Sequence, residues 1–263
     1  MYSIDDLLAI MKRLRDPVDG CPWDLEQSFR TIVPHTLEEA YEVADAIERG
    51  NPGDLCDELG DLLFQVVFYA RLGEEGGVFD FEHIVDGICN KLIRRHPHVF
   101  ADERIDNAEQ QSRAWERHKQ AERRQKSAGQ AGSQLDDVSL ALPALTRAQK
   151  LQKRAAAIGF DWNETEAVMD KVREEIAEVE AELQAGCGKA RLQDEIGDLL
   201  FVCVNLARHA GLDAEASLRQ GNHKFERRFR YIEQSLLAQG QALEGATLAQ
   251  MDALWDAAKE QGL

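Results

Sequence analysis

The chain has 263 residues, which is long for one domain and suits two. Hydrophobic residues make up 44%, enough for a buried core, and an aromatic content of only 7% favours helices over a β-sandwich or barrel. The chain carries 48 acidic and 31 basic residues, a formal net charge of −17. That charge argues against nucleic-acid binding, because it repels phosphate backbones.

The N-terminal segment shows no signal peptide, since Asp5 and Asp6 stand where basic residues would precede an apolar run. The longest apolar stretch, 62–70, is interrupted by Gln65 and is far shorter than the roughly 20 residues of a membrane span. Five scattered cysteines form no metal-ligand or redox spacing. We expect a cytoplasmic protein with free thiols and no membrane association.

The first half of the chain carries four polar motifs in order, separated by glycine and proline at 51–53 and 73–77. They are Trp23-Asp24-x-x-Gln27, Glu38-Glu39-x-x-Glu42, Glu58-x-Gly-Asp61 and Lys91-x-x-Arg94-Arg95. A polar segment rich in Gly, Ser and Gln follows at 123–140. Its composition predicts a linker between domains at 1–122 and 141–263.

The second half repeats the first. Residues 195–208 match residues 58–71 at nine of 14 positions without a gap, and 174–179 pair with 38–43. Further downstream, 224–228 pair with 91–95, and Trp162 and Trp255 correspond to Trp23 and Trp115. Features recurring in the same order indicate a duplication.

Each copy has the apolar spacing of helices. In the second copy, apolar residues recur every three or four positions in two runs: Val168, Val172, Ile176, Val179 and Leu183, then Ile196, Leu199, Leu200, Cys203, Val204 and Ala207. No segment has convincing strand alternation. The sequence predicts an all-α protein of two tandem helical domains.

Paired acids mark both copies. Glu175 and Glu178 lie on one helix face, and Glu195 and Asp198 repeat this spacing on the next helix, so antiparallel helices could aim four carboxylates at one point. The first copy offers the same pattern in Glu39, Glu42, Glu58 and Asp61. Close carboxylates repel by about 4 kcal/mol per pair at a dielectric near 20, so such a set needs cations. Oxygen ligands alone favour Mg²⁺ or Mn²⁺ over zinc.

Two other interpretations of the paired acids fit the sequence less well. A solvated acidic face explains most isolated Glu-x-x-Glu pairs, but here Asp198 directly precedes the apolar Leu199, and the pattern occurs twice. A di-iron carboxylate bundle requires Glu-x-x-His, and none of the seven histidines follows a glutamate at that spacing.

Basic and aromatic residues complete the pattern. Lys224, Arg227 and Arg228 lie on nearly one helix face and suit phosphate oxygens, although pairing with surface acids is the simpler reading. Lys171 lies one turn before Glu175, where the first copy has His35. Trp255 is either a core residue or a stacking surface for a base. With no P-loop or Rossmann fingerprint, these features indicate a metal-dependent nucleotide site of another kind.

The ordered motifs, including His96-Pro97-His98 after Lys91-x-x-Arg94-Arg95, resemble those of the MazG family of nucleoside triphosphate pyrophosphohydrolases along nearly the whole chain. The resemblance implies tandem all-α domains that dimerise, and Mg²⁺-dependent hydrolysis of NTPs and dNTPs to monophosphates and pyrophosphate. It also implies broad base tolerance in a housekeeping or stress role.

Carried over by motif, the metal ligands fall on Glu175, Glu178, Glu195 and Asp198, with Glu39, Glu42, Glu58 and Asp61 as a second set. The implied substrate contacts are Lys171, Val172, Arg173, Glu174, Glu175, Arg191, Leu192, Gln193, Asp194, Asp198, Lys224, Phe225, Glu226, Arg227, Arg228 and Trp255. The second copy is the expected catalytic one, and activity in the first stays open.

In the expected mechanism Glu178 positions or deprotonates the attacking water, and Lys224, Arg227 and Arg228 stabilise the departing charge. Which phosphorus is attacked stays open. The competing hypothesis is a non-catalytic helical dimer that senses nucleotides or regulates a partner. Among enzymes, a dUTPase or a histidine-pathway pyrophosphatase is the nearest alternative.

Overall fold

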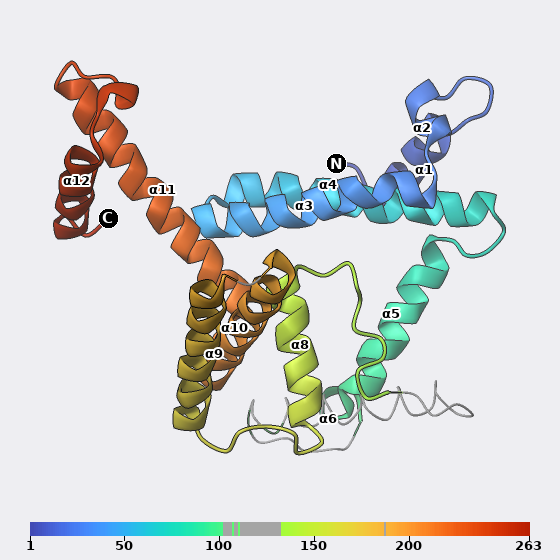
Figure 1. The fold of residues 1–263 in the computed structure, drawn as a ribbon. Helices are drawn as coiled ribbons and strands as arrows, with labels where there is room; N and C mark the ends of the chain where they lie inside the picture. Colours follow the sequence, from blue (N-terminus) through green and yellow to red (C-terminus); the bar gives the residue numbers. More distant parts are fainter. Residues whose placement is uncertain (102–106, 108–109, 111–132, 187) are drawn as a thin grey trace. The chain divides into compact units, whose positions relative to one another are not determined.

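The computed structural model describes residues 1–101, 107, 110, 133–186 and 188–263 (Figure 1). These residues form helices joined by short turns, with no strand in the described part of the chain, which confirms the all-α prediction. Two compact units divide the chain, 1–128 and 129–263. The predicted domain end at 122, residues 123–132 of the predicted linker, and Trp115 lie outside the described residues.

Unit one is built on a long antiparallel helix pair, α3 (Phe29–Arg49) and α4 (Pro52–Glu75). Gly50 ends α3 with φ 69°, a left-handed conformation that glycine adopts without a Cβ clash. Asn51 then caps α4, whose first residue is Pro52. The turn is therefore short, and the two helices lie side by side.

The remaining helices of unit one are α1 (Ile4–Leu14), α2 (Pro22–Glu26), α5 (Phe81–Arg95) and α6 (Pro97–Phe100). Ser3 and Asp6 form a capping box at the start of α1. The core is a cluster of apolar side chains from α1, α3 and α4, namely Met11, Ile32, Val67, Phe68 and Leu72. Burial of this cluster fixes α1 across the helix pair.

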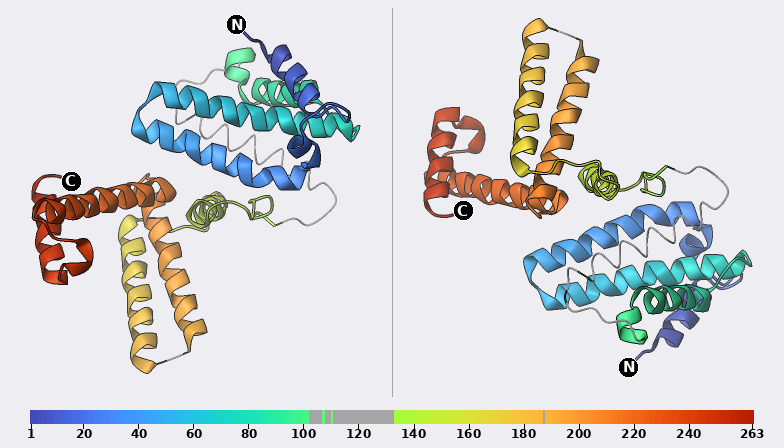
Figure 2. Two further views of the ribbon diagram at one scale, coloured as in Figure 1. Left: turned by 90° about the horizontal axis from the view of Figure 1, so that it is seen from above. Right: turned by 90° about the horizontal axis from the view of Figure 1, so that it is seen from below.

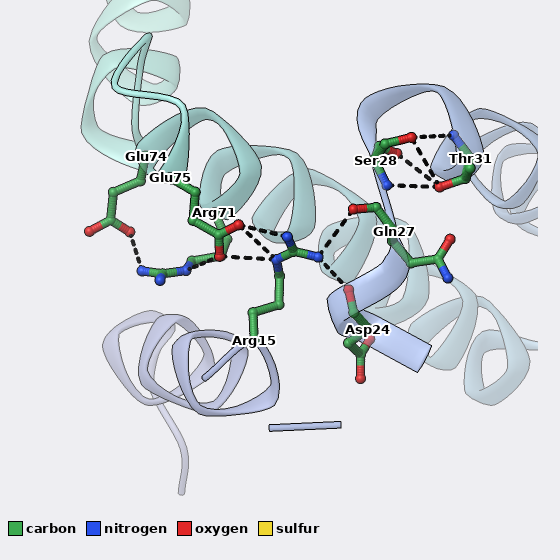
Figure 3. A network of polar contacts seen from close by, with 8 residues as sticks. All are labelled: Arg15, Asp24, Gln27, Ser28, Thr31, Arg71, Glu74 and Glu75. Atoms are coloured by element: carbon green, nitrogen blue, oxygen red, sulfur yellow. Dashed lines mark hydrogen bonds and ion pairs between the residues drawn. The ribbon is translucent and has the colours of Figure 1, made fainter. Parts of the chain in front are cut away.

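A buried arginine fastens α1 and the α2 turn to the C-terminal end of α4 (Figure 3). The Arg15 side chain is only 7% exposed and forms an ion pair with Glu75 at 2.6 Å. It also donates to the backbone carbonyls of Asp24 and Gln27. Arg71 shares Glu75, with Nε to Oε1 at 2.8 Å. The hydrogen bond from Arg15, followed by that from Arg71, lowers the pKa of Glu75 against the opposing effect of burial.

Unit two repeats the helix pair as α9 (Thr165–Ala185) and α10 (Lys189–His209), with Gly186 in the left-handed conformation after α9. Helix α8 (Ala144–Ala156) packs against α10 and α11 (Ala214–Ala238). Two buried glutamines hold it there: Gln152 donates to the Phe201 carbonyl at 2.8 Å, and Gln149 to that of Leu212 at 3.0 Å.

Helix α11 leaves the α9/α10 pair and extends away from it, as Figure 1 and both views of Figure 2 show. The short 3₁₀ turn η1 (Leu243–Gly245) and α12 (Leu248–Glu260) fold back against the far part of α11. Unit two therefore contains two separate helix pairs, α9/α10 and α11/α12.

The apolar stripes of the α9/α10 pair lie on helices, as predicted. Other residues of the chain bury only part of each stripe. Val168 and Val204 are buried, whereas Leu183 and Leu200 are 61% and 53% exposed. No described helix is both long and apolar enough to span a bilayer.

Candidate metal and nucleotide site

The second helix pair brings together three of the four predicted carboxylates. Single oxygens of Glu175, Glu195 and Asp198 all lie within 4.8 Å of one another, one from α9 and two from α10. The i, i+3 spacing on α10 places Glu195 and Asp198 on the face that meets α9. Glu178 lies beside this group on α9 with an exposed side chain, so the structure differs from the expected meeting of all four at one point. Glu178 contacts the group through a hydrogen bond with Glu175.

Glu175 is the buried centre of this second set, only 5% exposed. Its Oε2 atom is buried and makes no hydrogen bond with any described residue. An unpartnered buried carboxylate oxygen is costly, because it has lost water and gained no donor. Glu175 therefore has an oxygen without a protein partner and belongs to the group that it forms with Glu195 and Asp198, as a cation ligand would.

Glu178 has an altered affinity for protons. Desolvation is the largest cause, followed by a hydrogen bond with Glu175 and the charges of Glu175 and Glu195, and together they raise the pKa of Glu178 above its usual range. The charge of Lys171 opposes this shift. A carboxylate with a raised pKa is a better proton acceptor than an ordinary one.

Lys171 contacts the set directly. Its Nζ atom lies 2.7 Å from Glu175 Oε1 and 2.8 Å from Glu174 Oε1. The hydrogen bonds with Glu174 and Glu175 raise the pKa of Lys171, so the ammonium group stays charged. One oxygen of Glu175 therefore contacts a cation of the protein, and the other is buried without a hydrogen-bond partner among the described residues.

The first helix pair forms a similar set from other members. Glu39, Glu42 and Glu58 have oxygens within 4.8 Å of one another, and Asp61 is exposed outside this trio. Desolvation, then the charges of Asp61 and Glu42, raise the pKa of Glu39. Desolvation, then the charges of Glu42 and Asp61, also raise the pKa of Glu58. Each copy thus concentrates negative charge at its helix pair.

A buried amide supports the first set. Gln65 is 5% exposed, its Nε2 atom lies 3.5 Å from Glu39 Oε1, and its Oε1 atom has no hydrogen-bond partner among the described residues. Gln65 is not among the site residues that the sequence predicts. The signal that could have identified it was its position as the polar break in the apolar run 62–70, where the second copy has Val202.

Both sets suit a hard divalent cation. They offer carboxylate oxygens only, from two facing helices, and in the second set one buried oxygen has no other partner. Mg²⁺ and Mn²⁺ prefer such ligands, whereas zinc favours nitrogen and sulfur. The donor chemistry therefore fits the predicted metal.

The predicted phosphate-binding cations lie on the α11/α12 pair of unit two. Lys224, Arg227 and Arg228 are on α11, where Arg228 Cζ lies 5.3 Å from the centre of the Trp255 ring and Nε donates to the Leu263 carbonyl at 2.7 Å. Phe225 also contacts Trp255, with ring centres 5.3 Å apart. Helix α11 extends away from the α9/α10 pair, and none of the described contacts joins these cations to the carboxylates of the second set.

The other predicted contact residues lie on the helix pair. Arg173 pairs with Asp170 at 2.6 Å, and Arg191 pairs with Glu182 at 2.7 Å near the connection between α9 and α10. Val172 and Leu192 are half-buried, while Gln193 and Asp194 are exposed on the first turns of α10. Glu226 pairs with Arg230 on α11.

Comparison with known proteins supports a common origin for the two copies. The MazG nucleotide pyrophosphohydrolase domain matches residues 27–100 and again 163–232, more than half of the chain. The nucleoside triphosphate pyrophosphohydrolase of Escherichia coli K12 is 54% identical over 99% of this chain and 98% of its own length. A nucleoside triphosphate pyrophosphohydrolase/pyrophosphatase, MazG, of Thermotoga maritima is 37% identical over 97% and 95% of the two chains. The two helix pairs with their carboxylate sets are thus two copies of one domain, and the chain belongs to the MazG nucleotide pyrophosphohydrolase family.

Proposed function

We propose that this chain is a Mg²⁺-dependent nucleoside triphosphate pyrophosphohydrolase, releasing pyrophosphate and a monophosphate from NTPs and dNTPs. The observation that carries the proposal is the convergence of oxygens from Glu175, Glu195 and Asp198, in which Glu175 is buried and its Oε2 atom has no hydrogen-bond partner among the described residues. Its relatives' names support the reaction, since the full-length Escherichia coli relative is a nucleoside triphosphate pyrophosphohydrolase. Mn²⁺ would fit the same ligands.

In this proposal Glu175, Glu195 and Asp198 hold the cation. A bound Mg²⁺ supplies positive charge against the triphosphate and makes a water more acidic. Glu178 stays outside the trio, and its raised pKa suits it to take the proton of the attacking water. Lys224, Arg227 and Arg228 stabilise the negative charge that develops on the departing group.

The base is recognised without base-specific hydrogen bonds. Phe225 and Trp255 contact each other on the α11/α12 pair. Any base can stack on an aromatic ring, because every base has a π face. Broad tolerance among nucleotides follows, which suits a housekeeping or stress role in removing unwanted triphosphates.

The direct test is a product assay on the intact chain with each NTP and dNTP. With Mg²⁺ we expect equal amounts of monophosphate and pyrophosphate, and no product with excess EDTA. Diphosphate plus orthophosphate would contradict the proposed bond cleavage. Tight nucleotide binding without any metal-dependent product would favour the nucleotide-sensing alternative.

We further propose that the active form is a homodimer, in which α11 of one chain meets the carboxylates of the other. Two observations support this: the apolar side chains Leu183 and Leu200 are more than half exposed, and helix α11, which carries the cations, extends away from the α9/α10 pair of its own chain. A second copy would cover the stripes and complete the site.

Mixed dimers test this arrangement. Glu175→Gln chains and Arg227→Ala chains should each be inactive alone, and mixing them should restore activity, because one of the two sites then combines two intact halves. Light scattering should give twice the chain mass. A monomer with full activity, or mixtures without any recovery, would contradict the shared site.

A further inference from the structure

The two carboxylate sets differ in what holds their central glutamate. In the second set Lys171 contacts Glu175 at 2.7 Å from the preceding turn of α9. In the first set the equivalent position is His35, whose nearest acidic partner is Glu38 at 3.8 Å and whose ring lies edge-on to Trp23. The central Glu39 instead faces the neutral amide of Gln65 at 3.5 Å.

This difference changes the charge that a cation would meet. The ammonium of Lys171 neutralises part of the negative charge at the second set and occupies Oε1 of Glu175, which is 94% buried as a side chain. Glu175 is buried although the Lys171 side chain is 32% exposed, so solvent screens this contact less than it screens a pair of two exposed side chains. The Gln65 amide adds no charge, so the described contacts give the central Glu39 of the first set no cationic partner, and the charge of Arg49 acts on Glu58 instead.

We propose that Lys171 is a nucleotide-operated latch on Glu175, so that the second set takes a divalent cation together with a triphosphate while the first set takes one without nucleotide. The inference rests on the proposed function, since it assigns Glu175 to the metal. Lys171 is here a positioning residue: its ammonium moves from Glu175 to an anionic phosphate oxygen, and Glu175 then presents both oxygens.

The latch has a thermodynamic consequence. If the triphosphate draws Lys171 away from Glu175, nucleotide raises the affinity for the cation, and the cation must raise the affinity for nucleotide by the same factor. The second set is then disfavoured as a metal site until substrate arrives. The first set, lacking the lysine, shows no such coupling.

The test is a titration of the full chain with Mn²⁺ in the absence of nucleotide. The EPR signal of free Mn²⁺ measures how much of the metal is bound. Glu58→Gln isolates the second set, and Glu195→Gln isolates the first. In the Glu58→Gln background, Lys171→Met should tighten Mn²⁺ binding by about tenfold, the usual size of an outer-shell effect on metal affinity. The matched control is Arg173→Met, which removes a cation on the same helix that pairs with Asp170 instead.

The reverse change tests the first set. In the Glu195→Gln background, His35→Lys should install the latch on Glu39 and weaken Mn²⁺ binding by about tenfold. Addition of an α,β-methylene triphosphate analogue should strengthen Mn²⁺ binding to the second set, measured against the Mn²⁺ bound by the analogue alone. That gain should vanish with Lys171→Met. Circular dichroism checks that each variant is folded.

The outcomes separate the latch from the proposed function. If Lys171→Met and Arg173→Met bind Mn²⁺ equally well, the latch is wrong while the metal role of Glu175 stands. If Glu175→Gln does not change Mn²⁺ binding, the metal assignment itself is wrong, and the latch fails with it.

Discussion

Single side chains account for the difference between the two copies. Four acids recur in both, yet Glu175 meets a cation, Lys171, and Glu39 meets an amide, Gln65. In the second copy the position of Gln65 is Val202, which is buried in the ordinary way of an apolar residue. A buried amide with an unpartnered oxygen costs stability, so Gln65 stands where function, not packing, explains the residue best.

Lys171 was expected from its spacing to reach a phosphate, and the structure adds where it lies beforehand. The i, i+4 spacing alone allows an ordinary surface pair. The burial of Glu175 could not be read from the spacing, because it depends on how α9 faces α10. The burial of Glu175 is therefore set by how the two helices pack and not by the local sequence pattern.

At the scale of elements, the helix pairs were predictable and their surroundings were not. Periodic apolar residues and the glycine at each connection predict that α3 pairs with α4 and that α9 pairs with α10. The spacing of the acids predicts which faces of the paired helices meet. The direction of α11 was not predictable, because an apolar stripe does not reveal which helix, or whose, covers it. Arg15 was likewise missed, since nothing in its local sequence marks it as buried.

The Arg15 network at the end of α4 gives a pH-dependent prediction. Arg15→Met should lower the free energy of unfolding of unit one by about 2 kcal/mol at neutral pH, because a buried ion pair is broken while Arg71 remains as a partner of Glu75. Glu75 has a lowered pKa, so its contribution is present above the unfolded value near 4.5 and is lost as pH falls through the folded value. The difference between wild type and variant should therefore shrink below about pH 4.

Urea denaturation between pH 3 and pH 7 measures this difference. Arg13→Met is the control, because Arg13 is an exposed cation on the same helix. A stability loss that is the same at every pH would show that Arg15 acts by packing alone, against the ion-pair account.

At the scale of the whole molecule, a duplication has left two carboxylate sets with different partners. The formal charge of −17 includes the eight acids of these sets, and bound cations would offset much of it locally. An acidic chain can therefore handle an anionic triphosphate without a basic surface. In the proposed function catalysis belongs to the second set, and the first set would hold a cation without nucleotide.

The most direct measurement compares pyrophosphate release by Glu175→Gln and Glu39→Gln in otherwise intact chains, with Glu180→Gln as an exposed control on α9. We expect Glu175→Gln to reduce the rate by at least about 100-fold with Mg²⁺, since it removes the buried ligand at the site of chemistry. Glu39→Gln and Glu180→Gln should keep most of the activity. Near-normal turnover by Glu175→Gln, or a loss in Glu39→Gln of the same size, would contradict the assignment of catalysis to the second set.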